Sequence, residues 1–152
     1  MRSLKKQRGA AAVELGILAI PLVMLTFGVT EFGRAIYQYN IIAKSTRNAV
    51  RFLSTQTAGV SANDVTARCL AVYGNKTCGG QALVPNLTTA MVTICDSVNV
   101  ACIDSHRNQS TTSGVINLVT VTIKGYPFTS LVPQIIPSLT FGAVSTTMRQ
   151  VL

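Results

Sequence analysis

Residues 1–34 read MRSLKKQRG, AAAVE, LGILAIPLVMLTFGV and TEFGR, and they carry the strongest structural signal in the chain. The first nine residues hold four basic side chains and no acidic one. Residues 15–30 have no charged side chain, and with their apolar flanks they reach the roughly 20 residues that a helix needs to cross a bilayer. Because basic residues favour the cytoplasmic side, we predict a transmembrane helix over residues 10–33 with its N-terminus in the cytoplasm.

Three interpretations compete for this segment. A secretory signal peptide would be cut after the apolar run, but TEFGRAIYQY, which follows, offers no A-x-A pattern. An uncut anchor explains the length and the charges, but not Gly9 and Glu14 together. A prepilin-type leader over residues 1–9 would be cut between Gly9 and Ala10, and the helix would stay in the mature protein. We favour the third interpretation and keep the other two as alternatives.

Residues 8–54 resemble the start of TadE-like proteins, small pilin-like proteins of bacterial tight-adherence (Tad, or Flp) pilus systems. The matching features are RGxxxVE, the proline in the apolar run, the EFGRA segment and an amphipathic stretch that ends in RxxxRF. The C-terminal LTFGAVSTTMRQVL loosely resembles the final strand of that family, and residues 56–110 match nothing in it. Leu15 stands where major Flp pilins usually have an aromatic residue, which favours a minor pseudopilin.

The resemblance implies a structural role in the assembly of a Tad-type pilus at the bacterial inner membrane, with the C-terminal domain in the periplasm. It implies a prepilin peptidase, other pilin-like subunits and Tad assembly proteins as partners, together with the lipid bilayer. It also leaves open whether the protein enters the pilus. The alternative function is that of an uncleaved, membrane-anchored periplasmic binding module.

Glu14 has a special place in this interpretation. Burying a carboxylate in a bilayer costs roughly 2.5–3.5 kcal/mol on insertion scales. In a pilin-like assembly its natural partner is the free amine that cleavage creates at Ala10 of a neighbouring subunit, because an unpaired buried charge is strongly unfavourable. The simpler interpretation is an acid at the membrane surface.

The helix is predicted to run from about residue 11 to residue 54, with residues 34–54 outside the membrane. From residue 32 onward, the residues of one stripe recur at alternating spacings of four and three, which marks one face of a helix. We expect this stripe to pack on the chain's own C-terminal domain. Its members are Phe32, Ile36, Tyr39, Ala43, Thr46, Val50 and Leu53.

Residues 55–152 are predicted to form a small outer α+β domain, pilin-like in that its antiparallel sheet packs on the long helix. A polar linker leads to a short helix ending at Val72, capped by Ser61 or Asn63. The clearest strand spans residues 115–124, where Val119, Val121 and Ile123 alternate with polar residues. Two further strands are expected at 91–95 and 139–148, and an irregular connection at 126–137.

The four cysteines all lie on the predicted outer side, and an even number in a small exported domain indicates disulfides. We favour pairing Cys69 with Cys78 and Cys95 with Cys102, because each pair brackets a loop with turn residues; crossed pairings stay open. A four-cysteine zinc site is disfavoured because these spacings are wider than those of the usual ligand pairs.

No enzyme, metal or cofactor is predicted. His106 is the one histidine, in the polar run DSHRNQSTTSG, and we expect it to be a solvated loop residue. A secreted enzyme with a conventional signal peptide is a weaker alternative. The net charge is +8, and removing the four charges of the leader would leave +4, so nucleic-acid binding is not expected.

Overall fold

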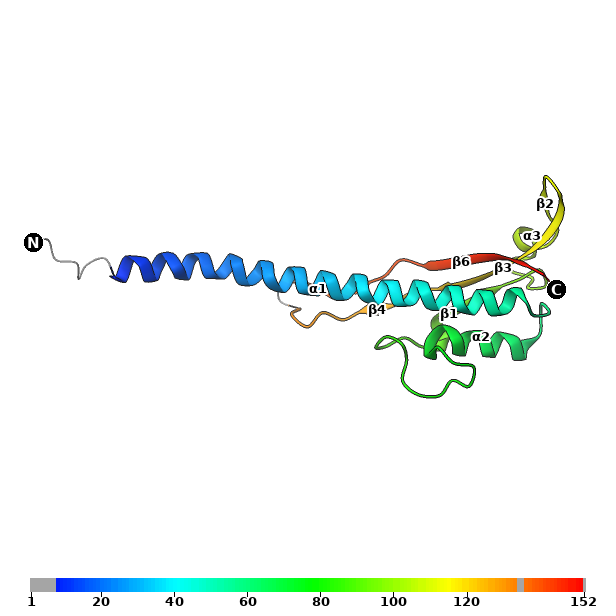
Figure 1. Ribbon diagram of the computed structural model, residues 1–152, viewed down its shortest axis with the longest axis horizontal. Helices are drawn as coiled ribbons and strands as arrows, with labels where there is room; N and C mark the ends of the chain where they lie inside the picture. Colours follow the sequence, from blue (N-terminus) through cyan, green and yellow to red (C-terminus); the bar gives the residue numbers. More distant parts are fainter. Residues whose placement is uncertain (1–7, 134–135, 152) are drawn as a thin grey trace, which may run out of the picture.

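One long helix and a small domain on its C-terminal half make up the protein (Figure 1). The computed structural model describes residues 8–133 and 136–151. Residues 1–7 of the predicted leader lie outside this range. Helix α1 spans Arg8–Ser54, so both Gly9 and Ala10 belong to it. The domain runs from α2 to the last strand, and Figure 1 shows it alongside the second half of α1 only.

Helix α1 continues through Pro21 without a break. Proline cannot donate a backbone hydrogen bond to the carbonyl four residues earlier, so one such carbonyl in this helix loses its partner. One turn later, the Thr26 hydroxyl donates to the backbone carbonyls of Leu22 and Val23, at 3.1 and 2.8 Å. Such local bonds satisfy threonine hydroxyls in apolar surroundings.

The face of α1 that packs on the domain differs from the predicted stripe in its first half. Thr46, Val50 and Leu53 are buried as expected, but Phe32 and Ile36 are 66% and 45% exposed. The stripe repeats every 3.5 residues and a straight helix every 3.6, so the stripe drifts by about 20° per heptad. Over three heptads the stripe therefore rotates around the helix, away from the face that packs on the domain. The helix residues buried in its place are Glu31, Gln38, Ile42, Ser45 and Ala49.

A four-stranded antiparallel sheet forms the other layer of the domain. Its central strand β3 (Gly114–Ile123) pairs with β1 (Val92–Cys95) and β6 (Val144–Gln150), and its start pairs with β2 (Gln109–Thr111). Helix α1 contacts β3 and β6, whereas α2 contacts α1 and β1. The predicted α+β class, with a long helix on a small antiparallel sheet, is confirmed.

Alternation along β3 is as predicted. Val119, Val121 and Ile123 are buried, and the threonines between them are only half-buried on the outer face. The same period-two pattern holds in β6, where Val144 and Gln150 point inward. The buried side chains of β1, β3 and β6 join those of both helices in one core.

Three details of the strand prediction are corrected. The sequence missed β2, which is short and polar. The segment expected to be irregular contains β4 (Pro127–Phe128), which pairs with β5 (Leu139–Thr140). The single strand expected over residues 139–148 is in fact two strands, β5 and β6. Two-residue ladders of this kind depend on partners distant in the chain and leave no local period.

Helix α2 spans Ser61–Tyr73, and neither predicted cap is correct. Val60 occupies the N-cap position and makes no side-chain cap bond, while the Asn63 side chain donates to the Thr57 carbonyl. The helix ends at Gly74, whose φ of 72° is left-handed and suits glycine. The remaining short helices are η2 (Thr89–Met91) and α3 (Ile103–His106).

Candidate functional site

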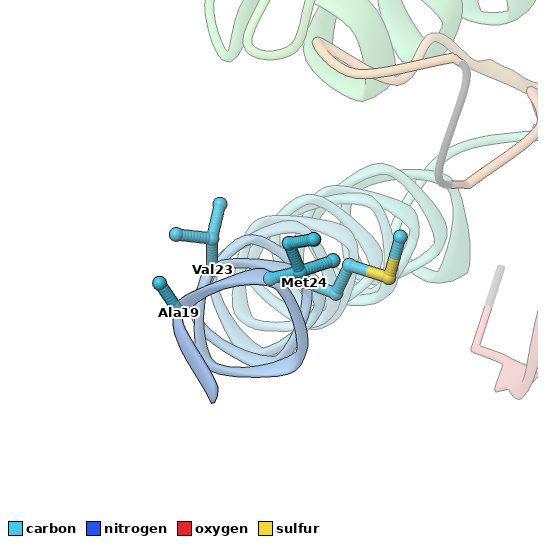
Figure 2. A pocket seen from close by; sticks show the side chains of 4 residues that line it. Ala19, Val23 and Met24 are labelled. Atoms are coloured by element: carbon cyan, nitrogen blue, oxygen red, sulfur yellow. The ribbon is translucent and has the colours of Figure 1, made fainter. Parts of the chain in front are cut away.

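The first half of α1 is apolar and has no protein packed over it. Among residues 10–30, every one is exposed except the half-buried Gly28. Figure 2 shows Ala19, Val23 and Met24 projecting from the outside of the helix. Soluble proteins rarely expose such a continuous apolar surface. In the described part of the chain, α1 is the one helix long and apolar enough to cross a membrane.

The predicted processing and assembly residues lie together at the start of this segment. Gly9, Ala10 and Glu14 are all exposed on the first turns of α1. Ala10 and Glu14 are four residues apart and therefore share a helix face. Within residues 8–133 and 136–151 the structure has one ion pair, and Glu14 is not part of it. The site is thus open to a partner.

Glu31 and Arg34 form that ion pair, at the point where α1 meets the domain. The Arg34 guanidinium donates to the Glu31 carboxylate at 3.0 Å, and the Leu131 backbone N–H donates to the same oxygen at 3.2 Å. Arg34 also donates to the Thr129 carbonyl and lies 4.7 Å from the centre of the Phe128 ring. The pair therefore ties the segment after β4 to the helix.

Sequence reasoning missed this cluster. Glu31 is only 3% exposed, although it follows directly on the uncharged run. The available signal was the spacing of three between an acid and an arginine in TEFGR, which places the two on one helix face. That spacing could not indicate the contact with Leu131, which lies 100 residues further along the chain.

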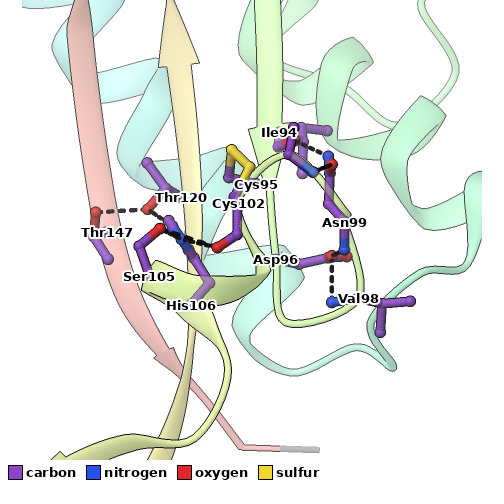
Figure 3. The surroundings of a disulfide bond; sticks show 11 residues. Ile94, Cys95, Asp96, Val98, Asn99, Cys102, Ser105, His106, Thr120 and Thr147 are labelled. Atoms are coloured by element: carbon purple, nitrogen blue, oxygen red, sulfur yellow. Dashed lines mark hydrogen bonds between the residues drawn. A yellow bond between two sulfur atoms is a disulfide. The ribbon is translucent and has the colours of Figure 1, made fainter.

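The cysteines lie in the pairs that the sequence favoured. The Cα atoms of Cys69 and Cys78 are 4.6 Å apart, and those of Cys95 and Cys102 are 5.7 Å apart, both within the range of disulfides. The first pair ties α2 to the turn that follows it. The second closes the loop between β1 and α3 (Figure 3).

Asp96 organises the loop inside the second disulfide. Its carboxylate accepts hydrogen bonds from the backbone N–H groups of Gly59, Val98 and Asn99, at 2.8–3.0 Å. Burial raises the pKa of nearby Asp64, and the negative charge of Asp96 raises it further. Because its oxygens already accept three backbone bonds, Asp96 has a structural role. Among the described residues no group of three acidic, histidine or cysteine side chains could hold a metal ion.

His106 is not the solvated residue that the sequence predicted. It is half-buried at the end of α3, and its Nε2 lies 2.7 Å from the Thr120 hydroxyl, which is 2.7 Å from that of Thr147 (Figure 3). Its Nδ1 lies 2.8 Å from the Ser105 hydroxyl. In the described part of the chain no carboxylate bonds to this imidazole, so a catalytic triad is not assembled around it.

Comparison with known proteins gives a match in the first third of the chain. No curated protein and no solved structure matches the chain. A family model does match, under the description TadE-like protein, over residues 9–51. Those residues are α1 almost in full, including the exposed apolar segment, Glu14 and the Glu31–Arg34 pair. The resemblance inferred from the sequence is thereby confirmed over this helix, and residues 9–51 of the chain are similar to TadE-like proteins.

Proposed function

We propose that the protein is a pilin-like structural protein, a pseudopilin, that takes part in assembling a Tad-type pilus at the bacterial inner membrane. The single observation that carries this proposal is the exposed apolar half of α1, which coincides with the TadE-like match. TadE-like proteins are associated with tight-adherence pilus systems. The role is one of helix packing, without catalysis.

In this proposal the predicted transmembrane helix over residues 10–33 is anchored in the inner membrane by its exposed apolar part, residues 10–30. The basic leader keeps the N-terminus in the cytoplasm, and the disulfide-bonded domain lies in the periplasm, where disulfides persist. The outward-facing apolar side chains contact lipid first and neighbouring helices on assembly. The partners are other pilin-like subunits and Tad assembly proteins.

A prepilin peptidase would cut between Gly9 and Ala10 in this scheme. The new amine at Ala10 would lie about 6 Å along the helix axis from Glu14, at about 1.5 Å per residue. Within one helix this pair shares a face, and in an assembly the amine of a neighbouring subunit can reach the same carboxylate. Glu14 is exposed, so its carboxylate is accessible to the amine of its own helix and to that of a neighbouring subunit, which supports the proposal.

The test is the N-terminal residue of the mature protein in its native host, from intact mass and N-terminal peptide sequencing. A start at Ala10 supports prepilin-type processing. A start at Met1 favours the uncleaved binding module, and a start beyond residue 30 favours a secretory signal peptide.

A pair of glycine variants sharpens this test. Gly9→Val should abolish the cut, whereas Gly16→Val should leave it intact. Both positions are on the same helix with open space for a side chain, so the two substitutions are sterically matched. Equal processing of both variants would contradict a cut at Gly9.

A further inference from the structure

The connection between β4 and β5 lies beside the outer end of the apolar part of α1. We call its described residues, 129–133 and 136–138, the β4–β5 loop. In Figure 1 it extends further toward the start of α1 than any other part of the domain. The bond from the Leu131 N–H to Glu31 puts Leu131 at the level of Glu31 on the helix.

With α1 anchored in the membrane as proposed above, Glu31 lies at the outer membrane boundary. A span of about 20 residues that begins at Ala10 ends close to residue 30. The uncharged run over residues 15–30 is roughly 24 Å long, at about 1.5 Å per residue, and so is shorter than a hydrocarbon core of about 30 Å. The Glu31 end of α1 is therefore drawn to the bilayer surface, and Leu131 with it.

The composition of the loop suits that depth. No charged residue occurs between Lys124 and Arg149. Leu131 is 72% exposed, and Leu139, directly after the loop, is 49% exposed. These two side chains are not buried in the core of the domain, so packing within the domain does not account for them. A bilayer surface accepts them, since apolar residues of peripheral segments insert at the headgroup boundary.

Exposed side chains of α1 extend the same surface. Phe32 and Ile36 are the next outward-facing apolar residues after Glu31, and they line a shallow hollow of about 260 Å³ with Leu139 and Phe141. The interfacial region of a bilayer is roughly 5–7 Å thick on each side. Ile36 lies about 7.5 Å above Glu31 along the axis, so this surface spans that layer and reaches its outer edge at Ile36.

We propose that the β4–β5 loop, with Phe32, Ile36 and Leu139, is a second membrane contact that inserts into the headgroup region of the outer leaflet. The Glu31–Arg34 pair holds the loop against α1, and its opposite charges compensate each other at this depth. The occupant of the surface is lipid and not a second copy of the chain, because the surface directly adjoins the apolar span of α1. This inference rests on the membrane anchoring of α1 proposed above.

Tryptophan fluorescence tests the inference, because the chain has no tryptophan of its own. Three single variants of the full chain, reconstituted in phosphatidylcholine vesicles, report three depths. Leu131→Trp probes the loop, Leu22→Trp probes the apolar segment of α1 away from both of its ends, and Val100→Trp probes an 89%-exposed position in the loop before α3. Each is quenched in turn by acyl-chain-brominated lipid and by iodide in the outer solution. All three positions are exposed, so the substitutions leave the core intact.

We expect Leu131→Trp to lose more fluorescence to brominated lipid, and less to iodide, than Val100→Trp does. Equal behaviour of these two variants overturns the second contact. Protection of Leu131→Trp from iodide without quenching by brominated lipid also overturns it, since a protein neighbour would then cover the loop. Leu22→Trp separates the two proposals: if brominated lipid does not quench it, the anchoring of α1 itself fails.

Discussion

Glu31→Gln would remove the negative charge from the pair that holds the β4–β5 loop on α1, with little change in volume. Breaking a buried ion pair from one side costs about 3–5 kcal/mol, and an exposed pair contributes about 0–1 kcal/mol. Here Glu31 is 3% exposed and Arg34 is 28% exposed, so an intermediate loss of roughly 1–3 kcal/mol is expected. The glutamine oxygen still accepts from the Leu131 N–H, which keeps the loss below the upper bound.

Amide hydrogen exchange at Leu131 measures this loss directly, because that N–H donates to Glu31. At about 1.4 kcal/mol per factor of ten, exchange at Leu131 should accelerate roughly 5- to 150-fold in detergent-solubilised protein. The Lys124 N–H, which donates to the Met91 carbonyl, is the internal control and should keep its rate. Unchanged exchange at Leu131 would refute the view that this ion pair holds the loop. Equal acceleration at both amides would mean that the variant loosens the whole domain.

Three further predictions concern the core, one carboxyl and the assembly residue. Ile123→Ala should lower the free energy of unfolding by about 2–5 kcal/mol because it leaves a cavity under β3, whereas the exposed Val115→Ala should change it by less than about 0.5 kcal/mol; urea titration distinguishes them. Burial and the charge of Asp96 raise the pKa of Asp64 in the folded state, so the folded state loses stability as pH rises through that pKa. Asp64→Asn should therefore raise Tm at neutral pH, and a gain in Tm that persists below the pKa of unfolded aspartate would contradict this. Glu14→Ala should permit processing but impair assembly, which is measured by comparing the mature protein in membranes with the protein in sheared pili. Normal incorporation of this variant into pili would contradict a role of Glu14 in assembly.

Local patterns were enough to predict the main elements. The apolar run, the basic leader and the absence of a second proline before residue 85 predicted one helix over residues 11–54, and α1 is that helix. Strict alternation at Val119, Val121 and Ile123 predicted β3 and its buried face. These signals depend on residues a few positions apart, which is the distance over which helix and strand periods operate.

Elements without a local period were missed or misplaced. The three-residue β2 and the two-residue β4 and β5 exist because a partner strand supplies their hydrogen bonds. The caps of α2 were wrong for a similar reason, since the Asn63 side chain bonds to Thr57 in the preceding loop and not to its own helix. His106 was expected to be in solvent, but α3 sets it against Thr120 of β3.

The extent of the apolar helix, the favoured cysteine pairs and the TadE-like motif were readable from the chain alone, because each lies in a short stretch or in close sequence spacing. Tertiary structure decided which face of α1 is covered and where the β4–β5 loop lies. A heptad stripe drifts on a straight helix, so its contacts depend on where the domain docks. The contact of Glu31 with Leu131 joins residues 100 positions apart, and only the packing of the sheet on α1 brings them together.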